Sequence, residues 1–233
     1  MNKEQKVSTE ATEFYLVRHG RTYWNDEGRW QGQADAILNE TGRLQAEAVA
    51  GAFAETFAEG EPAQNLTAIY SSDLKRAVDT AEAIARRVGI PVQTDPRLRE
   101  INLGEWQGLL SAELHRRWPE TMARWEADAA RTRPPKGETL AEVAARVHAA
   151  MHDIARQHLG ECVIVVSHQI PIIIARQWAH SAPDFPGREL AVRNGTWVHL
   201  RSHMGESVGG NIAAPVWEEV GIGGTSEDVT LVL

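Results

Sequence analysis

Four short apolar runs along the chain predict the strands of a sheet. They cover residues 13–18, 66–71, 162–167 and 195–200. The third run, Cys-Val-Ile-Val-Val-Ser, is apolar at nearly every position, as expected for a strand with both faces buried. Such strands are typical of parallel sheets covered by helices. The last run alternates more between apolar and polar residues, which predicts a place toward the sheet edge.

The segments between these strands repeat their apolar residues every three or four positions, which predicts amphipathic helices. The predicted helices cover residues 42–58, 74–88, 111–128 and 140–154, with an interruption of the third at Pro119. The fourth opens with Thr139 and Glu142 at the spacing of a capping box. Another helix is expected to start near Pro171, because proline suits the first helical turn. Strands alternating with helices predict an α/β protein with a mainly parallel sheet.

The two ends of the chain differ in pattern from its middle. Residues 1–12 have too little apolar surface to offset the entropy lost on ordering, which predicts a flexible N-terminal arm. Residues 13–201 are predicted to form a single domain. Residues 202–233 form a C-terminal extension of unknown role, expected to pack on the same domain. A hairpin, a flap over the site and a tail docked on a second subunit are all open for it.

Composition and charge narrow the class of protein. The chain has 233 residues and one cysteine, which excludes a disulfide scaffold and a cysteine-based zinc module. Its formal charge of −8 argues against nucleic acid or an anionic membrane surface as a partner. It has no apolar run of about 18 residues, and its polar N-terminus lacks the pattern of a secretory signal. We therefore expect a cytoplasmic protein that binds neither nucleic acid nor membrane.

Polar residues follow three of the predicted strands, at the point where each strand ends. The first strand is followed by Arg18 and His19, the second by two serines and then Arg76, and the third by His168 and Gln169. Ligands of open α/β sheets bind beyond the carboxyl ends of the strands. Arginine pairs with phosphate oxygens, neutral imidazole can attack phosphorus, and a helix start favours anions. The sequence therefore predicts a crevice that binds a phosphoryl group.

The segment Leu16–Asn25 resembles the signature of the histidine phosphatase superfamily, also called the phosphoglycerate mutase-like family. Five fixed residues between Arg18 and Asn25 would occur by chance somewhere in the chain with a probability on the order of 10⁻⁴ at average residue usage. Further matches follow in the family's order: Gln31-Gly32, Ser71–Ala81, Leu98–Gly108, Gly137–Thr139 and Val166–His168. The resemblance implies a three-layer α/β/α fold of the phosphoglycerate mutase-like type.

The resemblance also implies a role for each residue of the site. His19 would be the nucleophile that takes the phosphoryl group, and Glu100 the proton donor to the leaving group. Arg18, Arg76 and His168 would stabilise the charge on the transferring oxygens, and no metal or other cofactor is implied. The predicted substrate-binding residues are Arg18, Thr22, Asn25, Gln31, Gly32, Arg76, Glu100, His168 and Gln169, with capping of the turn as the alternative for Thr22.

Departures from the family pattern bear on the reaction. Ile101 and Leu103 stand where cofactor-dependent phosphoglycerate mutases carry a basic residue and a tyrosine, and Gln169 replaces a frequent glycine. In mutases those groups bind the carboxylate and the second phosphate of phosphoglycerate. Without them, we expect water to hydrolyse the phosphohistidine before the phosphoryl group returns to the substrate. We therefore predict a phosphomonoesterase that hydrolyses a small phosphorylated metabolite. A phosphoglycerate mutase and a non-catalytic phosphate-binding protein are the alternatives, and a homodimer is left open.

Overall fold

The computed structural model describes residues 11–58, 65–181, 190–203 and 215–224. Within them, a six-stranded sheet has the order β3-β2-β4-β1-β5-β6. The strands are β1 (Thr12–Arg18), β2 (Leu66–Ser71), β3 (Val92–Thr94), β4 (Cys162–Ser167), β5 (Thr196–His203) and β6 (Val216–Gly224). β3, β2, β4 and β1 pair in parallel, and β5 pairs antiparallel with both β1 and β6. The carboxyl ends of β1, β2 and β4 therefore meet at one side of the sheet.

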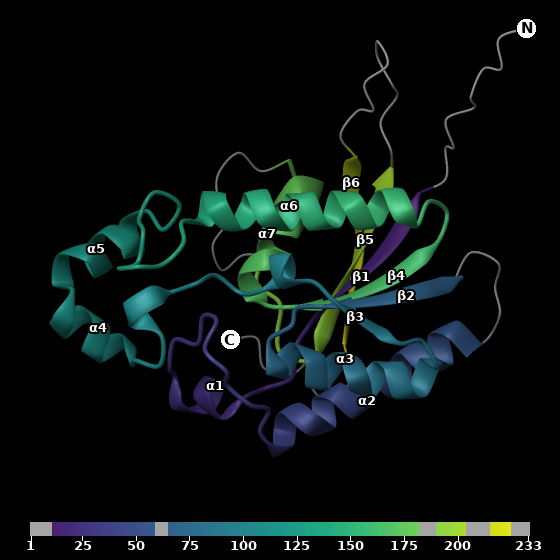
Figure 1. Cartoon of the computed structure of the whole chain (residues 1–233), viewed down its shortest axis with the longest axis horizontal. Coiled ribbons are helices and arrows are strands. Elements are labelled where there is room, and N and C mark those ends of the chain that lie inside the picture. Colours follow the sequence, from purple (N-terminus) through teal and green to yellow (C-terminus); the bar gives the residue numbers. More distant parts are fainter. Residues whose placement is uncertain (1–10, 59–64, 182–189, 204–214, 225–233) are drawn as a thin grey trace, which may run out of the picture.

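Helices cover both faces of this sheet (Figure 1). One face carries α2 (Glu40–Ala58) and α3 (Lys75–Val88), and the other carries α6 (Leu140–Gln157) and α7 (Gln169–Ala179). Side chains of β1 alternate between two apolar cores: Phe14 packs on the α6–α7 side, and Tyr15 on the α2–α3 side. The predicted three-layer α/β/α architecture is confirmed. No helix of the described ranges is both long and apolar enough to cross a bilayer.

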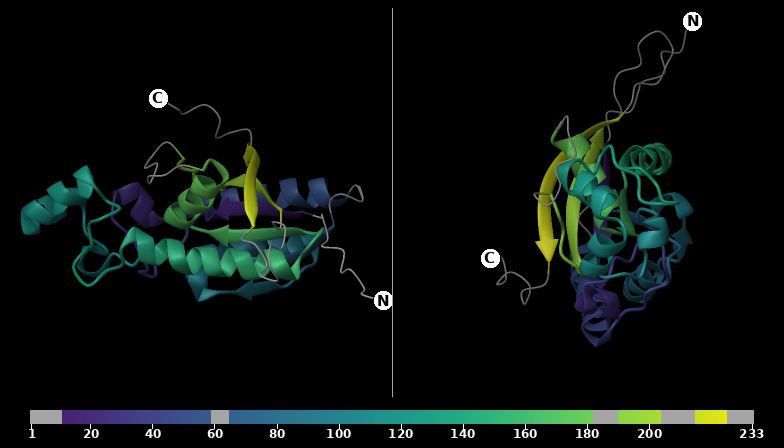
Figure 2. Two further views of the ribbon diagram at one scale, coloured as in Figure 1. Left: turned by 90° about the horizontal axis from the view of Figure 1, so that it is seen from above. Right: turned by 90° about the vertical axis from the view of Figure 1, so that its left-hand side faces the viewer.

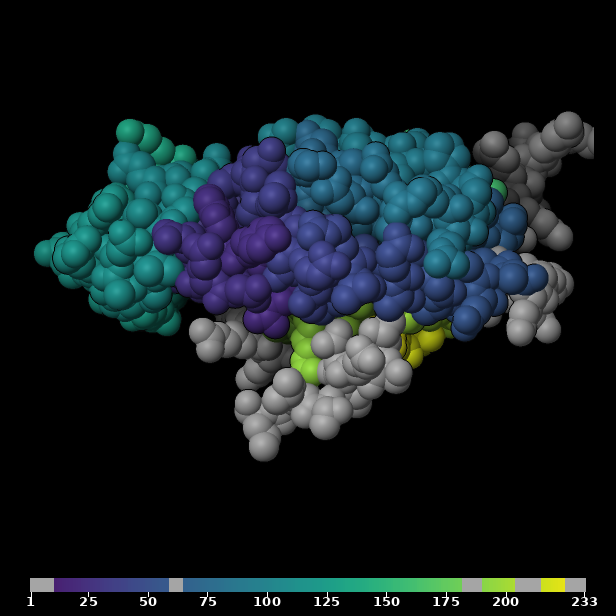
Figure 3. Space-filling model, turned by 90° about the horizontal axis from the view of Figure 1, so that it is seen from below, coloured from purple at the N-terminus to yellow at the C-terminus, as the bar shows by residue number. Residues whose placement is uncertain are grey.

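Shorter helices gather at one end of the molecule. They are α1 (Tyr23–Glu27), α4 (Ser111–Arg117), α5 (Pro119–Ala127) and two 3₁₀ helices, Pro96–Leu98 and Gly104–Trp106. α4 and α5 extend beyond the sheet (Figures 1 and 2), and Figure 3 shows them as the teal projection at that end. Trp125 of α5 packs edge-on against Trp30 and Trp106, with ring centroids 6.2 and 5.5 Å apart. This aromatic contact fixes α5 beside the loops that follow β1 and β3.

The sequence patterns located most of these elements. All four predicted strands occur, and so do all five predicted helices, including α7 around Pro171. Pro119 separates α4 from α5, and Thr139 forms a capping box with Glu142. The patterns missed β3, which has only three residues, as well as β6 and the five-residue α1. β5 lies toward the sheet edge as predicted, and β6 pairs on its outer side as the edge strand.

Both predicted boundaries of the domain differ from the structure. Thr12 begins β1 and is fully buried, with its hydroxyl 3.0 Å from the Ala155 carbonyl oxygen, so the sheet includes the last residue of the predicted arm. At the other end β5 continues to His203, and β6 lies in the predicted extension. Trp217 of β6 packs on Phe14, with ring centroids 5.1 Å apart, so this part of the extension is a sheet strand. Residues 1–10, 204–214 and 225–233 lie outside the described part.

Candidate active site

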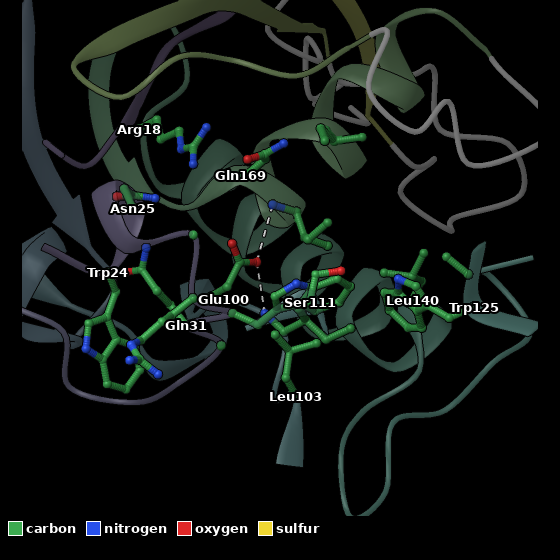
Figure 4. A pocket seen from close by; sticks show the side chains of 18 of the residues that line it. Arg18, Trp24, Asn25, Gln31, Glu100, Leu103, Ser111, Trp125, Leu140 and Gln169 are labelled. Atoms are coloured by element: carbon green, nitrogen blue, oxygen red, sulfur yellow. Dashed lines mark hydrogen bonds between the residues drawn. The ribbon is translucent and has the colours of Figure 1, made fainter. Parts of the chain in front are cut away.

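A pocket of about 930 Å³ lies at the carboxyl ends of the parallel strands (Figure 4). Most of the predicted site residues line it: Arg18, His19, Asn25, Gln31, Gly32, Arg76, Glu100 and Gln169. They come from the end of β1, from α1 and the loop after it, from the first turn of α3, from the segment before Gly104 and from the start of α7. Thr22 and His168 do not line the pocket, although His168 packs on His19 with ring centroids 5.1 Å apart.

The turn after β1 depends on glycine at position 20. A Cβ atom there would lie 2.3 Å from the carbonyl oxygen of Gly42, near the start of α2. Two backbone segments meet at this point, so neither can move aside for a side chain. The Gly20 amide donates to the Thr80 hydroxyl at 3.1 Å, which joins the turn to α3. This close packing holds the preceding residue, His19, at the floor of the pocket.

The imidazole of His19 has its electron pair on Nε2. Its Nδ1 lies 2.7 Å from the Gly20 carbonyl oxygen, and only a protonated nitrogen donates to a carbonyl. Nε of Arg76, which can only donate, lies 3.2 Å from Nε2. Burial, Arg76 and Arg18 lower the pKa of His19 well below its ordinary value. At neutral pH the ring is therefore uncharged, with a nucleophilic nitrogen directed to Arg76.

Arg76 is a buried cation with 1% of its surface exposed. Its two terminal nitrogens donate to the carbonyl oxygens of Gly32 and Ala34 at 2.7 and 2.9 Å. Burial lowers the pKa of Arg76 to about 10, so the side chain stays charged at neutral pH. In the described part of the chain, no carboxylate lies within salt-bridge distance of it. Arg76 therefore presents a positive charge at the pocket without an ion-pair partner among the described residues.

Arg18 contributes a second cation from the last position of β1. Its Nη1 donates to the Val192 carbonyl oxygen at 2.7 Å, while its buried Nε has no hydrogen-bond partner among the described residues. Burial lowers the pKa of Arg18 to about 10 as well. Two buried guanidinium groups at one pocket favour a doubly charged anion such as a phosphoryl group. No group of three His, Cys, Asp or Glu side chains that could hold a metal occurs in the described ranges.

His168 lies behind His19 and is fully buried. Its Nε2 pairs with the Ser72 hydroxyl at 2.8 Å, and its Nδ1 has no partner among the residues described. Burial, Arg76 and His19 lower the pKa of His168 well below its ordinary value. The polar contact that orients the His168 ring therefore comes from the end of β2.

Two residues of the site's support were not identified from the sequence. Ser72 lies within the motif after β2, so its position was available, but its contact with His168 depends on the pairing of β2 with β4. Asn194 donates through Nδ2 to the carbonyl oxygen of His19 at 2.9 Å. The Asn194-Gly195 dipeptide before β5 is a turn signal, yet nothing in the sequence places it beside β1.

Glu100 lies in the pocket with its carboxyl group held by two backbone amides (Figure 4). Oε1 accepts from Ile101 N at 3.0 Å and from Ile170 N at 3.3 Å. Burial raises the pKa of Glu100 above its ordinary value, although these amides, Arg76 and Arg18 act in the opposite direction. The start of α7 was predicted to bind an anion, and its Ile170 amide in fact binds this carboxyl group. A carboxyl that retains its proton at higher pH is suited to donate it.

The predicted site residues around α1 have two different roles: Thr22 caps the helix, whereas Asn25 and Gln31 line the pocket. Thr22 is fully buried, and its hydroxyl accepts from the Asn25 amide at 3.1 Å, which makes it the N-cap of α1. The alternative role noted for Thr22 is thus the one its geometry shows. Asn25 directs its side-chain nitrogen into the pocket (Figure 4). Gln31 has a buried Oε1 atom without a hydrogen bond to any described residue, so this pocket residue keeps an unused acceptor.

Apolar side chains make up much of the remaining lining of the pocket. They include Ile101, Leu103, Met122, Trp125, Leu140 and Ile173. Arg29 also lines the pocket, but its guanidinium pairs with Glu27 and donates to the Gly108 carbonyl oxygen at 2.7 Å. The positions that carry the basic residue and the tyrosine in mutases thus present aliphatic side chains to the pocket.

The site matches a known family. The model of the histidine phosphatase superfamily (branch 1) matches residues 14–209. The chain is 41% identical to a metal-independent phosphoserine phosphatase of Arabidopsis thaliana over 169 residues, which cover 72% of this chain and 68% of that protein. It is 36% identical to a probable phosphoglycerate mutase of Yersinia pestis over 183 residues, covering 77% of this chain and 80% of that one.

The fold is also similar to that of solved phosphatase structures. The structure of a mycobacterial glucosyl-3-phosphoglycerate phosphatase in complex with VO3 aligns with a TM-score of 0.76 and 30% identity. The alignment covers 91% of this chain and 99% of the mycobacterial one. The chain therefore belongs to the histidine phosphatase superfamily.

Proposed function

We propose that the protein is a phosphomonoesterase that transfers the phosphoryl group of its substrate to His19 and then to water. The observation that carries this proposal is the state of His19, whose Nε2 is unprotonated and lies beside a buried cation. A phosphate dianion held by Arg18 and Arg76 places its phosphorus against this nitrogen. The same cations offset the charge that develops on the transferring oxygens.

The proposed reaction has two steps. In the first, Nε2 of His19 forms a bond to phosphorus, the ester P–O bond breaks, and the leaving oxygen takes the proton of Glu100. In the second, a water molecule attacks the phosphorus and gives a proton to the Glu100 carboxylate, while the electron pair of the N–P bond returns to Nε2. The products are an alcohol and inorganic phosphate, and both side chains regain their initial protonation states. The raised pKa of Glu100 supports its role as the initial proton donor.

Hydrolysis is favoured over mutase activity by the groups that follow Glu100. Ile101 and Leu103 line the pocket, and Arg29 is engaged by Glu27. A mutase must retain a substrate with further acidic groups while the phosphoryl group returns to it, and these aliphatic side chains offer no charge for that purpose. An assay with 3-phosphoglycerate and a bisphosphoglycerate primer tests this choice. Rapid isomerisation would overturn it in favour of the mutase.

The proposed substrates are small phosphorylated metabolites. The names of the relatives support this class, since they include a phosphoserine phosphatase and a glucosyl-3-phosphoglycerate phosphatase. A cytoplasmic site of action agrees with the acidic chain and with its single, buried cysteine.

Substitution of the nucleophile tests the mechanism. His19→Ala should abolish hydrolysis of p-nitrophenyl phosphate and the acid-labile phosphoenzyme trapped from a radiolabelled substrate. His203→Ala, at the end of β5 with a half-exposed side chain, is the matched control and should retain both. Hydrolysis that survives in His19→Ala would show that another residue is the nucleophile. A wild-type protein that binds phosphate but hydrolyses no ester would instead support the non-catalytic alternative.

A further inference from the structure

The segment that carries Glu100 has little regular structure of its own. The 3₁₀ helix before it ends at Leu98, and no helix or strand covers residues 99–103. The carbonyl oxygens of Arg99 and Glu100 therefore have no partners in a helix or sheet ladder. A proton donor needs a fixed position relative to the leaving oxygen, since an error of about 1 Å can lower a rate about 10²-fold. The contacts that hold this segment thus bear directly on catalysis.

Arg146 supplies these contacts from the middle of α6. Its Nη1 donates to the carbonyl oxygens of Arg97 and Arg99 at 2.8 and 2.6 Å, and its Nη2 donates to that of Glu100 at 2.9 Å. The Nη2 and Nε groups also bind the Glu138 carboxylate, at 2.9 and 3.0 Å. All five N–H donors of the guanidinium are thereby used. The side chain is 17% exposed and does not line the pocket.

Glu138 extends this contact to the neighbouring backbone. Its Oε2 accepts from the Asn102 amide at 2.8 Å, so both sides of Glu100 are held. Gln33 donates to the Glu100 carbonyl oxygen at 3.0 Å, and it lies between Gly32 and Ala34, the residues whose carbonyl oxygens bind Arg76. The loops that carry the proton donor and position the phosphate-binding arginine are therefore joined at one carbonyl group.

We propose that Arg146, paired with Glu138, is a positioning residue that fixes Glu100 for proton transfer to the leaving oxygen. This inference rests on the proposed function, in which Glu100 is the proton donor. Arg146 acts through the backbone of residues 97–102 and touches neither substrate nor nucleophile. Its loss therefore affects the protonation of the leaving group and leaves phosphoryl binding and the attack by His19 in place.

Two esters with different leaving groups separate this role from a structural one. Dinitrophenolate is a weak base and leaves without a proton, whereas the alkoxide of glycerol phosphate needs one. We expect Arg146→Met to lower kcat/KM for glycerol phosphate about 10²-fold and that for 2,4-dinitrophenyl phosphate less than about threefold. kcat/KM is the proper quantity because it reports the transfer to His19 and excludes the later hydrolysis of the phosphoenzyme. A partial loss of folded protein lowers both values equally.

Milder variants keep the test valid if Arg146→Met folds poorly. Glu138→Gln retains the shape of the partner and should change the ratio of the two kcat/KM values in the same direction by a smaller factor. Arg146→Lys keeps the charge but offers three donors instead of five, and should lie between wild type and Arg146→Met. Arg156→Met, an exposed position on the same helix, is the matched control and should leave the ratio unchanged.

A comparison with Glu100→Gln distinguishes failure of this inference from failure of the proposed function. If Glu100 is the proton donor, Glu100→Gln alone loses glycerol phosphate hydrolysis selectively. The double variant with Arg146→Met should then be no slower on this ester than Glu100→Gln alone. Equal losses on both esters in Arg146→Met, or no loss on either, would overturn the positioning role. An unselective Glu100→Gln would overturn the assignment of the proton donor itself.

Discussion

Replacement of Arg76 by methionine should remove activity with a modest effect on stability. The guanidinium is held charged in a buried site, where burial lowers its pKa to about 10. Keeping the folded protein charged at this position therefore costs about 3 kcal/mol relative to water. Arg76→Met removes that cost, but it leaves the carbonyl oxygens of Gly32 and Ala34 without a donor. It also removes the donor to Nε2 of His19, a residue that lines the pocket. Two unpaired buried acceptors cost about 2–6 kcal/mol together.

These two effects oppose each other. We expect the free energy of unfolding of Arg76→Met to differ from that of the wild type by no more than about 3 kcal/mol. The loss of a preorganised donor to the phosphoryl oxygens should lower kcat by about 10²- to 10³-fold. If both expectations hold, Arg76 contributes far more to catalysis than to folding, as is common where function requires a strained or charged site.

Urea unfolding with and without inorganic phosphate measures both effects. Phosphate at 100 times its Kd should stabilise the wild type by about 2.7 kcal/mol and should stabilise Arg76→Met much less at the same concentration. Arg87→Met, at the exposed end of α3, is the matched control and should lie within about 0.5 kcal/mol of the wild type with full activity. A destabilisation of Arg76→Met beyond about 5 kcal/mol would show that the cost of burying the charge does not offset the loss of the two hydrogen bonds. Activity within tenfold of the wild type would refute the phosphate-binding role.

Two further predictions concern pH and specificity. For an alkyl phosphate, kcat/KM should persist well below pH 6.5, because the pKa of His19 is lowered and its ring stays neutral. At higher pH, kcat/KM should fall as the pH rises through the raised pKa of Glu100, because the carboxyl group then loses its proton. The fall at high pH should be absent for a dinitrophenyl ester, and a fall common to both esters would contradict the assignment of Glu100. Ile101→Arg should raise kcat/KM for 3-phosphoglycerate relative to a neutral ester by about tenfold or more, since a charge-assisted hydrogen bond contributes about 1.5–3 kcal/mol. Ile222→Arg, exposed on β6, is the control, and an equal ratio in both variants would contradict the role of position 101.

The sequence predicted those features that depend on local spacing. Arg18 and His19 follow a buried strand directly, so the rule for strand ends placed them at the pocket. The support of the site could not be predicted in the same way. The contact between Arg146 and the Glu100 carbonyl joins residues 46 positions apart. The hydrophobic pattern of α6 shows only that position 146 is polar and does not indicate what its side chain contacts. The capping role of Thr22, in contrast, depends only on the local spacing between Thr22 and Asn25, and it was among the roles considered from the sequence.

In the proposed mechanism, the hydrogen bond from His19 to the Gly20 carbonyl oxygen has a consequence for the transition state. As Nε2 bonds to phosphorus, the imidazole becomes positively charged and its Nδ1–H becomes a stronger donor. The bond to Gly20 O, already 2.7 Å long with a neutral ring, then becomes charge-assisted and about twice as strong. An interaction that strengthens only as the reaction proceeds raises kcat without tightening substrate binding. The arginines that keep the free ring neutral are meanwhile offset by the bound dianion, so they oppose the charged ring least when it forms. On the proposed mechanism, Arg18 and Arg76 therefore keep His19 neutral in the free enzyme and allow the ring to become positively charged only when a phosphoryl group is bound.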